Sequence, residues 1–401
     1  MKVIDGGITA PMGFIAQGVG AQIKYKNRRD VAVIYSPVAC AAAAVYTTNL
    51  VRAACLDICQ KHLENGTAQA IVVNSGNANA CTGEQGRDNA IETAIYAASL
   101  LNIEPHEVLV ASTGVIGVQM PLDKVLSGVK EAVGSLSPEG SHNAAMAIMT
   151  TDLVKKEIAV QIELQGKTVT IGAIAKGSGM IHPNMATMLA FITTDASISK
   201  SCLQRMLKSS VDVSYNMISV DRDTSTNDMA AILANGLAGN STIEDESSPD
   251  YQIFKTALDY VNTTLAKKIA RDGEGANHLM EVQVIGAADQ INARTIARSI
   301  TGSNLTKTAI FGHDANWGRI LAAAGYSGAC FDPYRVDVYL GREKVAENGM
   351  GLQFDEARVR RELEGETVVI TIDLKSGDGR ATAWGCDLSY DYIKINADYR
   401  T

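Results

Sequence analysis

Two runs of alternating apolar and polar residues, Glu157–Leu164 and Thr168–Ile174, place the strongest constraint on how this chain can fold. Alternation with a period of two is typical of a β-strand that buries one face. The intervening Gln165-Gly166 suits a tight hairpin turn, although other short loops could connect the same strands. The sequence therefore predicts an antiparallel hairpin near the middle of the chain.

Further strands and helices are predicted on both sides of this hairpin. Buried strands are expected at Val31–Tyr35, Ile71–Asn74 and Val108–Ser112, and Ser36-Pro37 predicts a turn after the first of them. Residues 236–250 are interpreted as a surface loop or a subdomain linker. Apolar residues at helical spacing predict helices at Asp88–Leu101, Asp123–Val133, Lys200–Val211, Tyr251–Ala270 and Phe354–Glu364. A separate C-terminal module is indicated by Met280–Ile285, Asp289–Ile300, Val336–Leu340 and Val368–Leu374.

Composition narrows the class of protein. Of 401 residues, 46% are apolar, only 5% are aromatic and 35 are glycine, which favours an α/β protein with a core of small aliphatic side chains. The net charge of −8 argues against a nucleic-acid partner. Seven cysteines without a CxxC pair favour a reducing, cytoplasmic setting and no metal site. Neither an apolar leader nor a membrane span is expected, because the uncharged stretch Val31–Val51 is rich in alanine and polar residues.

The segment from Ala175 to Ala190 combines a tight loop with the start of a strand. Two glycines and a proline within residues 177–183 indicate a sharp change of direction, and Met188–Thr193 continues as an apolar, strand-like run. Thr187 stands where the loop meets this strand. Taken alone, a threonine in this position is most often an ordinary β-branched strand residue.

A threonine can also act as a self-activating nucleophile. If the chain breaks before Thr187, its own α-amine becomes the base beside its hydroxyl. The pKa of a free α-amine is ordinarily about 7.7–8.0, so this amine can be largely neutral near pH 7–8, particularly if it is partly desolvated. The same hydroxyl can create that amine, because it can attack the carbonyl of Ala186 in an N→O acyl shift that ester hydrolysis completes.

The wider pattern resembles the ornithine acetyltransferase family, the ArgJ-type enzymes of arginine biosynthesis. The resemblance extends over nearly the full chain, and Ala186-Thr187 matches the position at which that family cuts itself. The other matching segments are 6–14, 74–83, 112–117, 221–228, 311–320 and 396–401.

This resemblance implies a fold and a division of the chain. The fold is a mixed α/β (α+β) α-β-β-α sandwich of the self-processing N-terminal-nucleophile type, with a smaller C-terminal α/β domain. Cleavage would give an alpha chain of residues 1–186 and a beta chain of residues 187–401, of which about 287–401 form the C-terminal module. The two chains are expected to stay together as an α2β2 heterotetramer.

The resemblance also implies a reaction. Acetyl would pass from N²-acetyl-L-ornithine to L-glutamate through an acetyl ester of Thr187, giving L-ornithine and N-acetyl-L-glutamate. No cofactor is implied, and acetyl-CoA stays open as a second acetyl donor. Neither nucleic acid nor membrane is an expected partner.

Site residues follow from the same resemblance. Thr113 and Gly114 match the oxyanion pair, Lys176 matches the lysine that binds the substrate carboxylate, and Glu274 matches the residue that faces the ornithine side-chain amine. Taken alone, these four suggest a turn, a surface charge and a loop carboxylate. The remaining matches to substrate contacts are Thr150, Thr187, Asn396 and Thr401.

Several features depart from this pattern or stay outside it. Arg222 stands where the family is expected to have glycine, and Ala315 where it is expected to have proline, so local turn geometry is in doubt at both. The spacing of acidic and polar residues in 221–227 resembles a calcium loop, but Thr226 and Ile232 occupy its glycine and glutamate positions. A turn held by carboxylate and hydroxyl side chains is the better interpretation. His182 is expected to shape its loop.

Two other functions stay open. A self-cleaved threonine amidohydrolase or aminopeptidase of similar fold would pass the acyl group to water instead of glutamate. A binding protein without catalysis would use Thr187 as an ordinary strand residue, and its chain would stay intact.

Overall fold

The computed structural model describes residues 1–182 and 188–397. These residues form two compact units. The first unit contains residues 1–177, 188–212 and 224–265, and the second contains residues 178–182, 213–223 and 266–397. Residues 236–250 lie wholly within the first unit, so they are a surface loop and not a linker between units.

The first unit is a layered α/β structure. Its strands are β1 (Lys2–Ile4), β2 (Ile15–Val19), β3 (Val31–Tyr46), β4 (Thr67–Asn77), β5 (Val108–Val115), β6 (Lys156–Leu164), β7 (Lys167–Lys176), β8 (Leu189–Thr194) and β10 (Met229–Ala234). They follow the order β1-β6-β7-β8-β10-β3-β4-β5, with β2 paired to β3.

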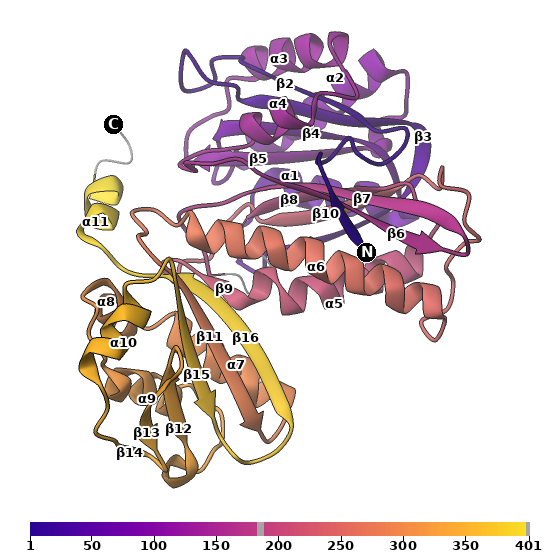
Figure 1. The fold of residues 1–401 in the computed structure, drawn as a ribbon. Coiled ribbons are helices and arrows are strands. Elements are labelled where there is room, and N and C mark those ends of the chain that lie inside the picture. The colour runs from indigo at the N-terminus through magenta and orange to yellow at the C-terminus, as the bar shows by residue number, and fades with distance from the viewer. Residues whose placement is uncertain (183–187, 398–401) are drawn as a thin grey trace. The chain divides into compact units, whose positions relative to one another are not determined.

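Helices cover both sides of these strands. They are α1 (Ala54–His62), α2 (Gly83–Leu101), α3 (Leu122–Gly134), α4 (Ser141–Ala147), α5 (Lys200–Val213) and α6 (Pro249–Arg271), the last of which continues into the second unit. Figure 1 shows α2 and α3 on one side of the strands and α5 and α6 on the other, which is the arrangement expected of the sandwich. Because both faces are covered, the central strands carry buried alanine, valine and isoleucine with little alternation.

The turn predicted at Ser36-Pro37 is wrong. Strand β3 is 16 residues long and includes both Ser36 and Pro37. Its register with β4 shifts between Tyr35 and Cys40. A proline cannot donate to a strand ladder, so it is tolerated at such an irregularity without ending the strand. The second half of β3, Ala41–Tyr46, pairs with β10, so this one strand joins β2 and β4 to the β8–β10 region.

The predicted hairpin is confirmed. Strands β6 and β7 pair from Lys156↔Ala175 to Leu164↔Lys167, and the turn residues Gln165 and Gly166 have φ values of 52° and 74°. Positive φ at both positions is the geometry of a type I′ hairpin turn. The five predicted helices are also present, with boundaries shifted by a few residues.

The second unit contains a seven-stranded sheet in the order β14-β13-β12-β15-β11-β16-β9. Its strands are β9 (Ile218–Ser219), β11 (Leu279–Ala287), β12 (Asp337–Leu340), β13 (Glu343–Glu347), β14 (Met350–Gly351), β15 (Thr367–Asp373) and β16 (Gly379–Cys386). Its helices are α7 (Gln290–Thr301), α8 (Asn304–Phe311), α9 (Trp317–Gly325), α10 (Glu356–Leu363) and α11 (Tyr390–Ala397). The strands and the helix expected in the C-terminal module are all found here.

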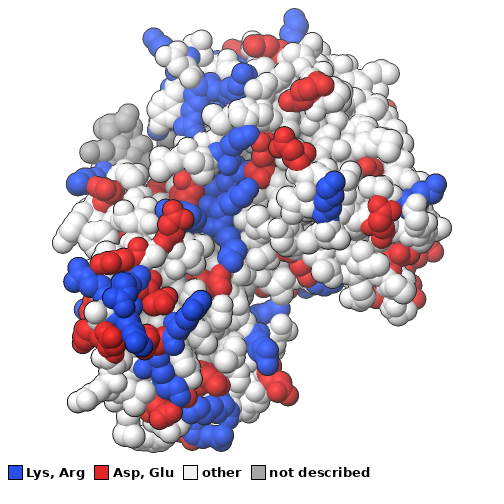
Figure 2. All heavy atoms as spheres, in the orientation of Figure 1, with Lys and Arg blue, Asp and Glu red and all other residues white. Residues whose placement is uncertain are grey.

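On the face of the second unit in Figure 2, basic and acidic side chains are interspersed, so neither sign forms a broad patch there. Across residues 1–182 and 188–397, the structure has no helix with the length and apolar character needed to cross a membrane.

Candidate functional site

The predicted oxyanion pair lies at the end of a parallel strand pair. Strands β4 and β5 align Ser75 with Thr113 and Gly76 with Gly114, and the register shifts directly after Gly76. Gly114 has a φ of 137°, and a Cβ at this position would lie 2.3 Å from the carbonyl carbon of Gly76. Only glycine fits this turn, because a side chain would collide with backbone. Thr113 and Gly114 are each half-buried.

Lys176 ends strand β7 beside this turn. Its side chain is buried, and its Nζ lies 3.5 Å from Thr113 Oγ1, the long limit of a hydrogen bond. Asp152 is the other anchor of this region, because its carboxylate accepts hydrogen bonds from the backbone N–H groups of Thr150 (2.9 Å) and Gly177 (2.7 Å). Of the residues predicted from sequence, Thr150 and Lys176 thus lie near the Asp152 carboxylate, and Lys176 in turn contacts Thr113.

Two lysines share that carboxylate. Lys156 Nζ lies 2.7 Å from Asp152 Oδ1, and both side chains are fully buried. Burial alone would raise the pKa of Asp152, but Lys176 and Lys156 hold it well below its usual value. Asp152 is therefore ionised at neutral pH, and it stabilises two buried ammonium groups.

A second buried carboxyl, that of Asp228, behaves in the opposite way. Burial raises its pKa well above the usual value, against the lowering effects of Ser225, Lys176, the Met188 backbone and Thr47. Its Oδ2 atom is buried and has no hydrogen-bond partner among the described residues. The raised pKa favours the protonated form of Asp228, whereas Asp152 carries the negative charge beside Lys156 and Lys176. The ammonium group of a lysine such as Lys176 suits the carboxylate of a substrate.

Loss of the buried Asp152–Lys156 ion pair should lower the stability of the protein strongly. Replacing Asp152 with asparagine would leave Lys156 buried without its anion, so we expect the free energy of unfolding to fall by about 3–5 kcal/mol at pH 7. Because the folded-state pKa of Asp152 is lowered, its contribution is complete above the unfolded pKa of about 3.9 and is lost as the pH falls below that value. Urea denaturation at pH 7 measures the change.

The control for this prediction is the pair Lys255–Asp259, which has the same i,i+4 spacing but is partly exposed. Asp259→Asn should cost about 1 kcal/mol or less. Equal losses for Asp152→Asn and Asp259→Asn would contradict the role of the buried pair.

Thr187, Ala186 and Thr401 lie outside the described residues, and the strand that follows Thr187 in the sequence is β8. Strand β8 starts at Leu189 and runs parallel to β10, with Leu189 aligned to Met229. The N–H of Met229 donates to the carbonyl of Met188 at 3.0 Å. The residues just before β10, Asn227 and Asp228, therefore lie at the end of the sheet where β8 begins.

Two other predicted residues meet in the second unit. Glu274 is buried, and its Oε2 accepts a hydrogen bond of 2.8 Å from Asn396 Nδ2 on α11. Its carboxyl lies against Gly179, where a Cβ would come within 2.4 Å of it. Burial, Asp221, Glu274 and Asp223 all raise the pKa of Tyr392, so its phenol stays protonated and can act as a hydrogen-bond donor. Glu274 is therefore part of a polar cluster and not a plain loop residue.

His182 and Arg222 also lie in the second unit. Nδ1 of His182 lies 3.0 Å from Ser219 Oγ, and its Nε2 lies 3.2 Å from Arg298 Nη2. Burial, Arg298 and Arg222 lower its pKa to about 4, so it is neutral and holds its loop in place, as the sequence indicates. Arg222 has a φ of 68°, a conformation that favours glycine and thus accounts for the glycine expected there.

The neighbouring turns also match the expectation. The N–H groups of Met180 and Ile181 donate to Asp221. Hydrogen bonds from Asp223 N to Asp221 Oδ1 (3.3 Å) and from Asn227 N to Ser225 Oγ (3.1 Å) close local turns. Ala315 precedes Asn316, which caps α9 through its side chain. Nothing in the structure explains why alanine stands where proline is expected.

Comparison with known proteins decides the family. The model of the ArgJ family matches residues 15–401. The arginine biosynthesis bifunctional protein ArgJ of Symbiobacterium thermophilum is 56% identical over 403 residues, which cover 100% of each chain. The chain belongs to the ArgJ family. It is an enzyme, a glutamate N-acetyltransferase (ornithine acetyltransferase) of arginine biosynthesis.

Solved structures of the ArgJ family match this chain in part. A crystal structure of the arginine biosynthesis bifunctional protein ArgJ from Bacillus halodurans is 47% identical, with a TM-score of 0.51, over 53% of this chain and 99% of that chain. A crystal structure of ornithine acetyltransferase complexed with ornithine from Mycobacterium tuberculosis is 38% identical, with a TM-score of 0.43, over 46% of this chain and 99% of that chain.

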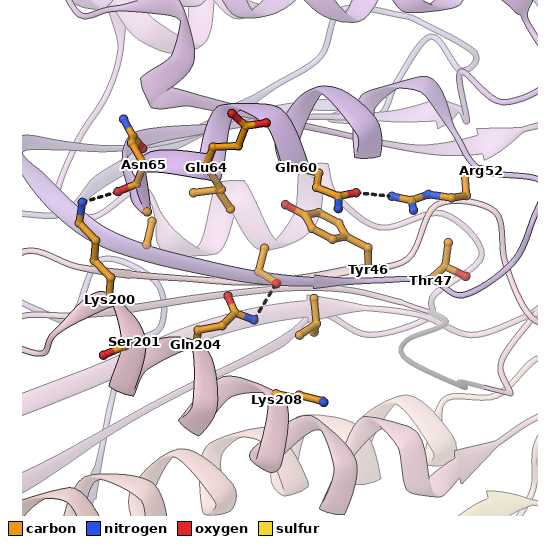
Figure 3. Close-up of a pocket in the computed structure, with 15 residues that line it drawn as sticks. Tyr46, Thr47, Arg52, Gln60, Glu64, Asn65, Lys200, Ser201, Gln204 and Lys208 are labelled. Atoms are coloured by element: carbon orange, nitrogen blue, oxygen red, sulfur yellow. Dashed lines mark hydrogen bonds between the residues drawn. The ribbon is translucent and has the colours of Figure 1, made fainter. Parts of the chain in front are cut away.

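A pocket of about 590 Å³ in the first unit contains none of the site residues that the ArgJ resemblance assigns (Figure 3). It lies between β3, the end of α1 and α5. Polar groups along its wall bond to one another: Lys200 donates to the carbonyl of Asn65, Gln204 to that of Ala44 at 3.2 Å, and Arg52 contacts Gln60 at 3.5 Å. Size alone therefore does not identify the substrate site of this ArgJ-family enzyme.

Sequence reasoning missed three residues around the oxyanion turn. Asp152 and Asp228 carry no local pattern that separates them from surface carboxylates, and Asn227 was assigned only to a local turn. Each also has a partner far away in sequence, which is Gly177 for Asp152, Thr47 for Asp228 and Ser112 for Asn227. The one available signal was proximity to the segments that resemble the ArgJ family, since Asn227 and Asp228 lie within 221–228.

Proposed function

We propose that the enzyme cleaves itself between Ala186 and Thr187 and then transfers acetyl from N²-acetyl-L-ornithine to L-glutamate through an acetyl-Thr187 ester. The observation that carries this proposal is the grouping of Thr113, Gly114 and Lys176 in one unit with the start of β8, the strand that follows Thr187. A tight glycine turn with a hydroxyl and a backbone N–H offers the donors that a tetrahedral oxygen needs.

Self-cleavage begins when Thr187 Oγ1 attacks the carbonyl carbon of Ala186. The carbon–nitrogen bond breaks, the α-amine of Thr187 takes the proton, and an ester links the two pieces. Water then hydrolyses this ester. The length of the chain in a relative's crystal structure supports this step. Residues 187–401 are 215 of 401 residues, or about 54% of the chain. In the Bacillus halodurans ArgJ structure, one chain is matched over 99% of its length by 53% of this chain, which is close to that fraction.

Acetyl transfer then proceeds in two halves. The Thr187 amine accepts the proton of its hydroxyl as Oγ1 attacks the acetyl carbon, and the resulting oxyanion receives hydrogen bonds from Thr113 Oγ1–H and Gly114 N–H. Because Thr113 Oγ1 accepts from Lys176, its own hydrogen is left to point at the oxyanion. Ornithine leaves with the proton on its amine, and the glutamate amine attacks the ester to release N-acetylglutamate and restore Thr187.

The ArgJ resemblance assigns substrate roles to one charged residue of each unit, and both roles are proposed here. Lys176, which lies in the first unit with Asp152 and Lys156, would bind the carboxylate of the amino acid. Glu274, held by Asn396, would bind the side-chain ammonium of ornithine. Thr150 and Thr401 are proposed as further substrate contacts.

The same enzyme is proposed to work without a cofactor, in the cytoplasm, as an α2β2 assembly of its own two pieces. Acetyl-CoA is a second donor to be tested, because the Symbiobacterium thermophilum relative is named bifunctional. An assay of glutamate acetylation from acetyl-CoA decides this point.

The proposal predicts both the pieces and the acceptor. Intact mass under denaturing conditions should show chains of 186 and 215 residues in place of one chain of 42.5 kDa. Acetylornithine alone should release ornithine once per active site, and adding glutamate should start steady turnover. Continued turnover without glutamate would instead support the amidohydrolase alternative, in which water is the acceptor. A single intact chain without transfer would support a binding protein.

A further inference from the structure

We propose that Asn227 is a positioning residue that fixes the oxyanion turn relative to the strand that follows Thr187. The inference rests on the proposed roles of Thr187, Thr113 and Gly114. It concerns a side chain that lies next to this machinery in the fold and far from the oxyanion turn in sequence.

The contacts of Asn227 reach two distant segments. Its Nδ2 donates to the carbonyl of Ser112 at 2.7 Å and to the carbonyl of Ala78 at 2.5 Å. Ser112 directly precedes Thr113, and Ala78 follows the segment that packs against Gly114. One amide group therefore holds both sides of the oxyanion turn.

The orientation of this amide is set by its surroundings. Both carbonyls can only accept hydrogen bonds, so the NH₂ group must face them. The other end of the amide, Oδ1, accepts from Thr226 Oγ1 at 2.5 Å. The side chain is 4% exposed, so water does not substitute for these bonds. All of its donors and its acceptor are used for positioning.

The place of Asn227 in the sequence links it to the strand that follows Thr187. Asn227 stands two residues before Met229, and Met229 is aligned with Leu189, the first residue of β8, in the parallel pair β8–β10. The backbone N–H of Asn227 is held locally by Ser225 Oγ at 3.1 Å. The segment that enters β10 is thus fixed at its backbone and extends its side chain to the oxyanion turn.

The hydrogen bonds from Asn227 to Ser112 and Ala78 are called the brace below. They matter because oxyanion donors act only at the right distance. A displacement of about 1 Å in a catalytic group can lower a rate about 100-fold. Asn227→Asp keeps the shape of the side chain but replaces the NH₂ donors with an oxygen that repels both carbonyls. We expect the Ser112–Gly114 segment to move while substrate contacts made by other residues remain.

The test compares Asn227→Asp with Asn235→Asp in the full chain. Asn235 follows the opposite end of β10, is similarly buried and donates through Nδ2 to the carbonyl of Met12 at 2.8 Å. Per cleaved molecule, Asn227→Asp should lower kcat for acetyl transfer about 100-fold with KM for acetylornithine unchanged. Both variants should lower the melting temperature by similar amounts, because each loses buried amide hydrogen bonds. Asn235→Asp should nevertheless leave kcat near the unmodified value.

Other outcomes are equally decisive. A folded Asn227→Asp chain that stays uncleaved while Asn235→Asp cleaves also supports the brace, because cleavage forms a tetrahedral oxygen too. If Asn227→Asp does not fold, Asn227→Ser and Asn235→Ser carry the same comparison. Full kcat in Asn227→Asp, beside an inactive Thr187→Ala chain, overturns the brace alone. Full transfer in Thr187→Ala overturns the proposed function itself.

Discussion

Thr187→Ala should remain one chain of 42.5 kDa and lose acetyl transfer by a factor on the order of 10⁴ or more. The substitution removes the hydroxyl that would attack the Ala186 carbonyl and later carry the acetyl group. Without cleavage, the α-amine that would serve as base stays in a peptide bond. Intact mass and an ornithine-release assay measure both effects on the same preparation.

The matched control is Thr187→Ser, which keeps a hydroxyl on the same carbon. We expect this variant to cleave and to transfer acetyl, at reduced rates. A Thr187→Ala chain that still splits at residue 186, or that transfers acetyl at the unmodified rate, would contradict the nucleophile assignment.

Gly114→Ala should lower kcat about 100- to 1,000-fold, the range seen when one oxyanion donor is lost. A Cβ on residue 114 would lie 2.3 Å from the Gly76 carbonyl carbon and 2.5 Å from the Asn77 nitrogen. Both atoms are backbone, so the β4–β5 turn must open and the residue 114 N–H must move. Steady-state kinetics with acetylornithine and glutamate measure the loss.

Gly117→Ala separates collision from backbone strain. Gly117 also has a positive φ, of 77°, but its Cβ would meet nothing within 4 Å. This variant should lose about 1–2 kcal/mol of stability from strain and keep its kcat. If both variants lose the same activity, the close approach of Gly76 and Gly114 does not explain the effect.

Local sequence patterns predicted most of the fold. The β6–β7 hairpin was predictable because alternation and the Gln165-Gly166 turn act over neighbouring residues. Ser36-Pro37 misled because a proline usually ends a strand, whereas tertiary pairing with β4 and β10 carries β3 through it. That pairing joins segments far apart in sequence, which local propensity does not register.

Some of the candidate site residues could be assigned from sequence and others could not. Thr113, Gly114 and Lys176 were assigned through segments that resemble the ArgJ family, and the geometry of the turn shows why residue 114 is glycine. Asp152, Asp228 and Asn227 could not be predicted, because their properties arise from burial and from partners such as Lys156, Lys176 and Ser112. A carboxyl with a raised pKa and one with a lowered pKa look identical in a sequence.

The acetyl-Thr187 ester can be detected on the enzyme itself. The enzyme is incubated with acetylornithine in the absence of glutamate, quenched in acid and digested, and the peptide that begins at Thr187 is identified by mass spectrometry. We expect one added acetyl group on Thr187 in the piece 187–401, which disappears when glutamate is added before the quench. Rapid transfer with no acetyl on that peptide, or acetyl on another residue, would contradict it.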